Sequence, residues 1–214
     1  MSRVHALKRK SVFLFDFDGT LVQSNAIKRE AFFEAVADCP DAADPLAEIL
    51  DTPGAGDRFA IFQTLADRVP AIDAVARTDA YGAICERRIL AAPEVEGAQK
   101  LLERLRARGA VAAINSATPQ APLQAVVAKM AISGYFAAVF GGPASKADNA
   151  RRFLSGRDVP PANIVVIGDG DSDRVCADEL GCDFIAIESN GNDFRQAPAH
   201  RAANLTVLFD WLDA

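Results

Sequence analysis

Short apolar runs rich in Val, Ile and Phe alternate along most of the chain with longer stretches whose apolar residues recur at helical spacing. The short runs predict buried strands, and the alternation predicts a parallel sheet, because helices connect parallel strands. Right-handed crossovers would build a doubly wound, Rossmann-like α/β sheet. The expected strands are Val12–Phe15, Val111–Ile114, Ala138–Phe140, Ile164–Ile167 and Phe184–Ile187.

Several helices between these strands have ends that the sequence marks. A glycine commonly follows the last turn of a helix, and Ser or Thr commonly precedes the first. The expected helices are Gly97–Arg108 before Gly109, Pro119–Met130 with Thr118 as N-cap, one that begins near Ala147, and Asp171–Leu180 before Gly181.

One segment, Asn25 to Ala91, contains helical patterns and no convincing strand. We therefore expect an all-helical cap domain, residues 25–91, inserted into a core formed by residues 11–24 and 92–214. Proline, glycine and capping residues mark the breaks between its helices. These are Pro40 at the end of the first helix, Asp44 and Pro45 at the start of the second, the loop "TPGAG" (Thr52–Gly56), and Asp57 as an N-cap. Four phenylalanines at helical spacing are expected in the core of this domain: Phe32, Phe33, Phe59 and Phe62.

The composition is that of an ordinary globular protein with a sizeable core. Of 214 residues, 50% are hydrophobic and 24% charged. There are 23 Lys and Arg against 29 Asp and Glu, a net charge of -6. This balance argues against a nucleic-acid partner, because binding to a phosphate backbone needs a basic surface.

The cysteines and the hydropathy of the chain indicate the cellular compartment in which we expect the protein. The four cysteines show no CxxC spacing and are expected to be buried free thiols in a reducing compartment: Cys39, Cys85, Cys176 and Cys182. No apolar stretch approaches the roughly 18 to 20 residues that span a bilayer, and the basic start lacks the apolar segment of a signal peptide. We therefore expect a cytoplasmic protein without a membrane partner.

Polar residues directly follow the expected strands. Ligands of open parallel sheets bind outside the carboxyl ends of the strands. Carboxylates gathered there would repel one another unless a hard cation such as Mg²⁺, which prefers oxygen ligands, neutralised them. The residues at these ends are Asp16, Asp18, Gly19 and Thr20 after the first strand, Asn115, Ser116, Ala117 and Thr118 after the second, Lys146 after the third, and Asp169, Asp171 and Asp173 after the fourth.

Four of these motifs carry a resemblance to a known family. "DFDGT" is similar to the DxDGT nucleophile motif of the haloacid dehalogenase-like hydrolase superfamily, and "GDGDSD" is similar to its GDxxxD acidic motif. Ser116 and Lys146 match its second and third motifs. Order and spacing agree over nearly the whole chain, which resembles the phosphoglycolate phosphatase-like branch. That branch carries a helical cap where residues 25–91 lie.

The resemblance implies a role for each motif residue. Asp16 would be the nucleophile that forms an aspartyl phosphate. Asp18 would protonate the leaving oxygen and then deprotonate the attacking water. The implied ligands of Mg²⁺ are Asp16, the backbone carbonyl of Asp18, Asp169 and Asp173, and the implied substrate-binding residues are Gly19, Ser116, Ala117 and Lys146. Asp171 lies outside the family's spacing and is interpreted as a carboxylate that interacts with a helix N-terminus.

The function implied by the resemblance is a magnesium-dependent phosphatase acting on a small phosphorylated metabolite. Two alternatives stay open, a β-phosphoglucomutase-like phosphomutase and a non-catalytic magnesium-binding regulatory module. Asp18 argues against a dehalogenase. Lys28, the only lysine of the insertion, leaves a phosphonatase weakly supported. The natural substrate and the oligomeric state are not determined by the sequence.

Arg58 is the one candidate substrate-binding residue of the insertion. It follows the "TPGAG" loop in a protein of net charge -6, where it is a candidate handle for a second anionic group of the substrate. The alternative is a solvated helix residue paired with a nearby carboxylate.

Overall fold

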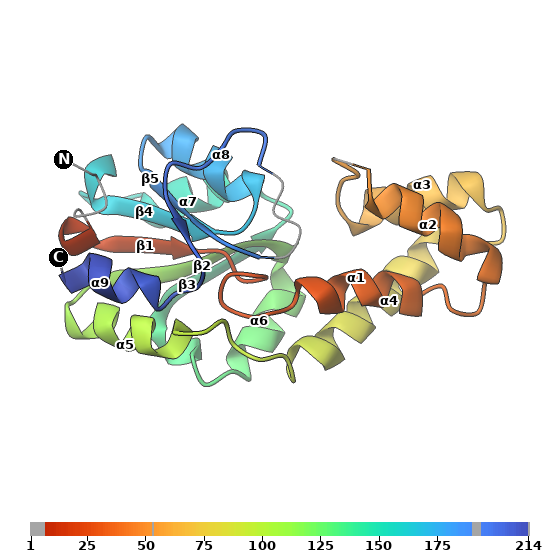
Figure 1. The fold of residues 1–214 in the computed structure, drawn as a ribbon, viewed down its shortest axis with the longest axis horizontal. Helices are drawn as coiled ribbons and strands as arrows, with labels where there is room; N and C mark the ends of the chain where they lie inside the picture. Colours follow the sequence, from red (N-terminus) through yellow and green to blue (C-terminus); the bar gives the residue numbers. More distant parts are fainter. Residues whose placement is uncertain (1–6, 53, 190–193, 214) are drawn as a thin grey trace. The chain divides into compact units, whose positions relative to one another are not determined.

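The computed structural model describes residues 7–52, 54–189 and 194–213 (Figure 1). The chain divides into two compact units, Met1–Gln23 with Ala92–Ala214, and Ser24–Ala91. Pro53 of the expected "TPGAG" loop lies outside the described residues.

The first unit contains a six-stranded parallel sheet with the strand order β3-β2-β1-β4-β5-β6. This order confirms the predicted Rossmann-like α/β fold. The strands are β1 Val12–Phe15, β2 Val111–Pro119, β3 Phe136–Gly142, β4 Ile164–Gly168, β5 Asp183–Ile187 and β6 Arg201–Ala202. All five expected strands are present. The two-residue β6 is too short for a hydrophobic pattern to predict it.

Helices cover both faces of this sheet. They are α5 Ala98–Ala107, α6 Gln120–Ala128, α7 Lys146–Leu154, α8 Asp171–Leu180 and α9 Val207–Asp213. On one face, α7 and α8 bury Phe153 and Cys176 against Val12, Leu14 and Val166. Figure 1 shows α5 and α9 on the other face. Strand β1 is buried along its whole length. Because it lies between β2 and β4 in the strand order, the chain that follows it emerges in the middle of the carboxyl edge of the sheet.

The expected start of the helix after β2 is wrong. Thr118 is not an N-cap, because β2 continues in extended conformation to Pro119 and α6 begins at Gln120 without a side-chain cap. The Thr118 hydroxyl group instead donates a hydrogen bond to Asp18. A tertiary contact has therefore replaced the local capping interaction that the sequence suggests.

The second unit contains four α-helices and, among its described residues, no strand of the sheet. They are α1 Asn25–Glu34, α2 Ala43–Leu50, α3 Arg58–Arg68 and α4 Ala74–Ile89. Asp57 caps α3 as expected, accepting hydrogen bonds from the backbone N–H groups of Phe59 and Ala60. The first helix ends at Glu34, well before Pro40, so that predicted boundary is wrong.

The core of this unit is aromatic. Phe32 lies with its ring centroid 5.3 Å from that of Phe62 and 4.3 Å from that of Tyr81. Phe33 is half-buried. Phe59 does not belong to the core, because 56% of its surface is exposed in the first turn of α3. Helical spacing had placed it with Phe62, which is fully buried three positions later in the same helix.

All four cysteines are free, and only Cys85 and Cys176 are fully buried, whereas Cys39 and Cys182 are half-buried. Among the described residues, each helix is too short or too polar to traverse a lipid bilayer.

Candidate active site

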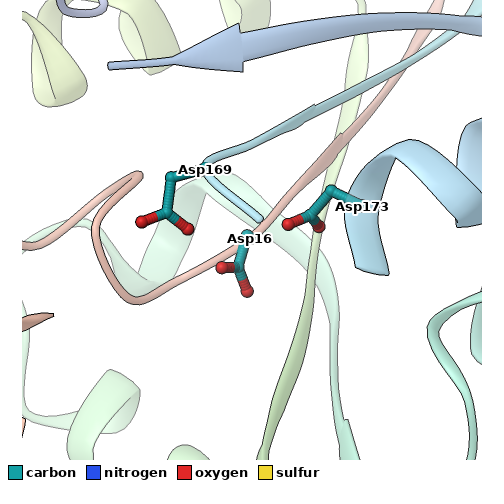
Figure 2. Close-up of side chains that lie close together, drawn as sticks. All are labelled: Asp16, Asp169 and Asp173. Atoms are coloured by element: carbon teal, nitrogen blue, oxygen red, sulfur yellow. The ribbon is translucent and has the colours of Figure 1, made fainter. Parts of the chain in front are cut away.

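Three carboxylates meet at the carboxyl edge of the sheet (Figure 2). Asp16 follows β1, Asp169 follows β4, and Asp173 lies in the first turn of α8. One oxygen atom from each carboxylate lies within 4.8 Å of the others. β1 and β4 are adjacent parallel strands, so their ends bring together residues that are about 150 positions apart in the sequence.

Lys146 places an ammonium group between two of these carboxylates. Its Nζ lies 2.8 Å from Asp16 Oδ1 and 2.8 Å from Asp173 Oδ1, and all three side chains are buried. Burial by itself would lower the pKa of Lys146, but the charges of Asp16 and Asp173 outweigh it and raise this pKa above its ordinary value. Lys146 is therefore a permanent positive charge beside Asp16.

Asp173 approaches the end of β4 unusually closely. Its Oδ2 accepts a hydrogen bond from the N–H of Gly170. A Cβ atom at Gly168 would lie 2.1 Å from Asp173 Cγ, so only glycine permits this approach. Burial raises the pKa of Asp173 to about 7, with Asp16 and Asp169 adding to this effect and Lys146 opposing it.

The three carboxylates fit a divalent cation. Lys146 alone does not balance three negative charges in buried surroundings. Asp16 Oδ1 is buried, and the Lys146 ammonium group lies 2.8 Å from it. Oxygen ligands of this kind suit Mg²⁺. The Asp18 side chain lies outside this group of three, so only its backbone carbonyl is left for the predicted contact with the metal.

Buried polar atoms without a hydrogen-bond partner concentrate near this edge. Among the described residues, the buried side-chain atoms of this kind are Asp16 Oδ1, Thr20 Oγ1 and Asn115 Oδ1. Asp16 Oδ1 is compensated by its ion pair with Lys146, whereas unpaired atoms such as Thr20 Oγ1 and Asn115 Oδ1 commonly cost about 1 to 3 kcal/mol each. Asp16 and Thr20 follow β1 and Asn115 is the middle residue of β2, which indicates that these segments are kept polar for a function.

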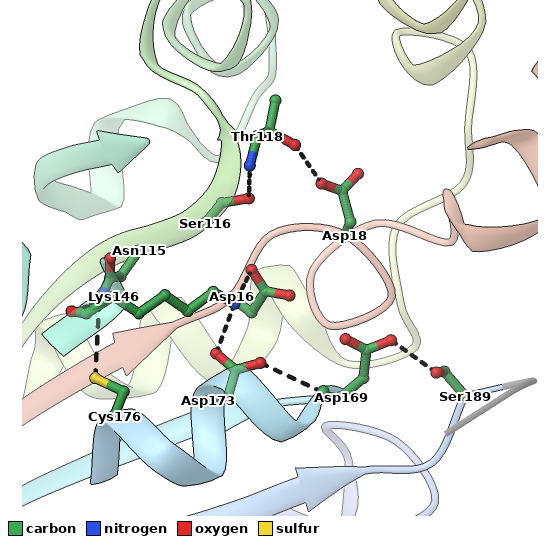
Figure 3. Close-up of polar contacts among 11 residues, drawn as sticks. Asp16, Asp18, Asn115, Ser116, Thr118, Lys146, Asp169, Asp173, Cys176 and Ser189 are labelled. Atoms are coloured by element: carbon green, nitrogen blue, oxygen red, sulfur yellow. Dashed lines mark hydrogen bonds and ion pairs between the residues drawn. The ribbon is translucent and has the colours of Figure 1, made fainter. Parts of the chain in front are cut away.

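Asp18 lies on the side of β2 (Figure 3). Its Oδ2 accepts a hydrogen bond of 2.8 Å from Thr118 Oγ1. Ser116 Oγ accepts a hydrogen bond of 3.1 Å from the Thr118 N–H. The hydroxyl hydrogen of Ser116 is not used in that contact, so this side chain can still donate to a ligand.

The other predicted site residues are placed as follows. The Gly19 N–H donates to Val22 O at 2.8 Å, and its predicted substrate contact stays a prediction. Ala117 is exposed next to Ser116. Asp171 Oδ1 accepts a hydrogen bond of 2.8 Å from Arg174 Nε, and this hydrogen bond holds the pKa of Asp171 below its ordinary value. Asp171 is therefore not one of the three clustered carboxylates.

Arg58 belongs to the second unit. Its guanidinium group lies 5.4 Å from the ring centroid of Phe59 and 5.7 Å from that of Tyr81. The described residues form no ion pair with it. Within the described ranges, therefore, no carboxylate pairs with Arg58, and its role as a substrate handle stays a prediction. Aromatic rings hold the side chain instead.

Three side chains support the site from positions that the sequence did not single out for this purpose. Asn115 Nδ2 donates to the backbone carbonyl of Lys146 at 2.7 Å, and Ser189 Oγ donates to Asp169 Oδ2 at 2.7 Å. Thr118 holds Asp18. In the sequence, the feature that could have indicated these roles is that each residue lies within or just beyond the polar end of a strand. No local pattern identifies the residue that each one contacts.

Comparison with known proteins agrees with this arrangement. Residues 10–181 match the family model of haloacid dehalogenase-like hydrolases. The phosphoglycolate phosphatase of Cereibacter sphaeroides is 28% identical over 199 residues, which cover 87% of this chain and 88% of that protein.

Solved structures share the fold. A predicted phosphoglycolate phosphatase from Haemophilus somnus superimposes with a TM-score of 0.74 at 17% identity, covering 94% of this chain and 97% of that one. CbbY from Rhodobacter sphaeroides, solved in complex with phosphate, has a TM-score of 0.71 at 20% identity, covering 96% of this chain and 100% of that one.

Proposed function

Because the chain belongs to the haloacid dehalogenase-like hydrolase family, we propose that it is a magnesium-dependent phosphatase that hydrolyses a small phosphomonoester through an aspartyl phosphate. Three clustered carboxylates, two of which contact one buried ammonium group, carry this proposal. The names of its relatives support phosphoric monoesters as the substrate class.

Asp16 is the proposed nucleophile. A carboxylate oxygen of Asp16 attacks phosphorus while the bond from phosphorus to the leaving oxygen breaks, and Asp18 gives its proton to that oxygen. Water then attacks the aspartyl phosphate, Asp18 accepts a proton from the water, and the bond between phosphorus and Asp16 breaks to release phosphate. Lys146 keeps Asp16 oriented and reduces the repulsion between Asp16 and an anionic substrate.

Mg²⁺ is the proposed cofactor, held by Asp16, Asp169, Asp173 and the backbone carbonyl of Asp18. When bound, it supplies positive charge that stabilises the phosphoryl oxygens during transfer. On the other side of the phosphoryl group, the hydroxyl of Ser116 and the N–H of Ala117 are the proposed hydrogen-bond donors. Gly19 is the remaining proposed contact with the substrate.

We further propose that residues 25–91 act as a cap domain that selects the substrate. Arg58 is its candidate handle for a second anionic group, supported by the aromatic rings that hold its guanidinium group. Phosphoglycolate, with a carboxylate beside its phosphate, is the first substrate to test, because relatives carry that name.

Phosphate release from a panel of phosphorylated metabolites tests the proposal, with magnesium and with excess chelator. We expect turnover only with magnesium. Asp16→Asn should be folded and inactive, because an amide cannot form the acyl phosphate. Full activity in chelator, or turnover of Asp16→Asn within tenfold of wild type, would contradict the proposal. No release from any compound would favour a binding module, and conversion that needs a bisphosphate activator would favour a mutase.

A further inference from the structure

The end of β2 contacts the Asp18 carboxyl group directly. We propose that Thr118 is a positioning residue that holds the Asp18 side chain in the orientation for proton transfer to the leaving oxygen. This inference rests on the proposed phosphatase activity. The contact that suggests it is the 2.8 Å hydrogen bond from Thr118 Oγ1 to Asp18 Oδ2, between residues 100 positions apart (Figure 3).

The two carboxylates of the "DFD" stretch point to different neighbours. Asp16 lies with Asp169 and Asp173 in the group that fits a cation, whereas the Asp18 side chain is not in that group. A carboxylate that coordinates a cation cannot also carry a proton to a leaving group. A hydrogen bond from β2 therefore favours the orientation in which Asp18 stays apart from the metal ligands.

The chain on either side of Thr118 is held against β3, where the register of the two strands shifts between Asn115 and Pro119. The side chain of Gln120 forms two hydrogen bonds with β3: it accepts one from the Gly141 N–H at 2.6 Å and donates one to Val139 O at 2.9 Å. A Cβ atom at Gly141 would lie 2.5 Å from the Thr118 carbonyl oxygen, so glycine is needed for the two strands to approach here. The Thr118 hydroxyl group thus projects from a segment that the contacts of Gln120 and Gly141 hold against β3.

Thr118 also connects Asp18 to the proposed phosphate-binding residue Ser116. Its N–H donates to Ser116 Oγ at 3.1 Å, while its hydroxyl donates to Asp18. One residue thereby sets the positions of the group that binds the phosphoryl oxygens and the group that protonates the leaving oxygen. A substitution that removes only the Thr118 hydroxyl group eliminates the contact with Asp18 and keeps the backbone contact with Ser116.

The test compares two esters with different leaving groups. An alkyl phosphate needs a proton on its departing oxygen, whereas 4-nitrophenyl phosphate releases a stable anion without one. Since kcat/KM reports the steps up to formation of the aspartyl phosphate, it isolates this protonation from the later hydrolysis. Thr118→Val preserves side-chain shape and the backbone contact with Ser116 and removes the hydroxyl group.

We expect Thr118→Val to lower kcat/KM by about tenfold or more for the alkyl ester and by less than about threefold for the nitrophenyl ester, a fraction of what general acid catalysis commonly contributes. Thr118→Ser should restore the alkyl activity. Combined with Asp18→Asn, Thr118→Val should cost nothing further, because Thr118 acts through Asp18. Thr206→Val is the matched control, since it also removes a hydroxyl that donates to a side-chain oxygen, that of Asn204.

Equal losses on both esters, or losses that add to those of Asp18→Asn, would overturn the role of Thr118. Circular dichroism checks folding, and Thr118→Ala gives the same comparison should Thr118→Val not fold. If the wild-type protein hydrolyses neither ester nor any metabolite of the panel, the proposed function itself fails, which is distinct from a failure of Thr118 alone.

Discussion

At the scale of single residues, the site depends on charges that compensate one another. Lys146 contacts Asp16 and Asp173 in buried surroundings, where an unpaired charge is costly. Asp169 is the least enclosed of the three clustered carboxylates and accepts a hydrogen bond from Ser189. Its contribution to metal binding can therefore be tested with the least disturbance of the core.

Asp169→Ala should raise the magnesium concentration needed for half-maximal activity by at least about tenfold, through loss of a direct ligand. A magnesium titration of activity measures this. Asp171→Ala is the matched control, because Asp171 lies two residues away and pairs with Arg174 instead. An unchanged requirement in Asp169→Ala, or an equal shift in the control, would remove Asp169 from the ligand set.

Asp173 should make the metal-free protein less stable as pH rises. Its folded-state pKa is about 7 against an ordinary value of 3.8, so the folded state binds this proton more tightly than the unfolded state. The resulting stability is fully present below about pH 4 and is lost as pH rises through about 7.

Urea unfolding in chelator from pH 4 to pH 8 checks this expectation. The free energy of unfolding of the wild-type protein should fall by up to a few kcal/mol relative to that of Asp173→Asn, whose amide does not titrate. Magnesium should reverse the fall at neutral pH by binding the ionised carboxylate. Parallel pH profiles of the two proteins in chelator would show that Asp173 does not carry the effect.

At the scale of elements, the site is built from the ends of β1, β2 and β4 and the first turns of α7 and α8. Rigid elements hold each side chain, and the flanking glycines permit close approaches that a Cβ atom would prevent, as at Gly168. In the helical unit, the candidate substrate handle is the first residue of α3. Arg58 lies there against two aromatic rings.

Arg58→Ala should cost roughly 2 to 4 kcal/mol in kcat/KM for a substrate with a second anionic group, and little for a generic aryl phosphate without one. The ratio of kcat/KM on the two substrates is the measurement. Arg68→Ala at the other end of α3 is the control, because Arg68 forms an exposed ion pair with Glu48. Equal losses on both substrates, or none on either, would count against Arg58 as a handle.

At the scale of the whole molecule, all proposed metal ligands belong to the first of the two compact units. Ligand binding protects the segments whose opening would release the ligand. Hydrogen exchange therefore distinguishes a metal site confined to the core from one that involves the helical unit.

Magnesium should slow amide exchange in peptides that cover β1, β4 and the start of α8, and leave peptides from α1 to α4 unchanged. Asp169→Ala should show little of this protection at the same magnesium concentration. Equal protection throughout residues 24–91 would indicate that the helical unit also takes part in binding the ion.

The sequence by itself determined the parallel α/β fold and the order of its motifs. Buried strands such as Val12–Phe15 are read from local hydrophobic periodicity, and the polar residues after them lie at one edge because parallel strands share a direction. Asp57 was correctly predicted as a cap because capping depends on the next few residues alone. Local rules misjudged Phe59 and the end of α1.

Only the tertiary structure decided which of these residues meet. Thr118 looks like a helix cap in the sequence, yet it donates to Asp18 because β2 lies beside β1 and stays extended to Pro119. The contacts of Asn115 with Lys146 and of Ser189 with Asp169 likewise depend on strand order, which no local pattern contains. Periodicity and capping act over a few residues, whereas the pairing of distant polar groups is set by which strands pack together.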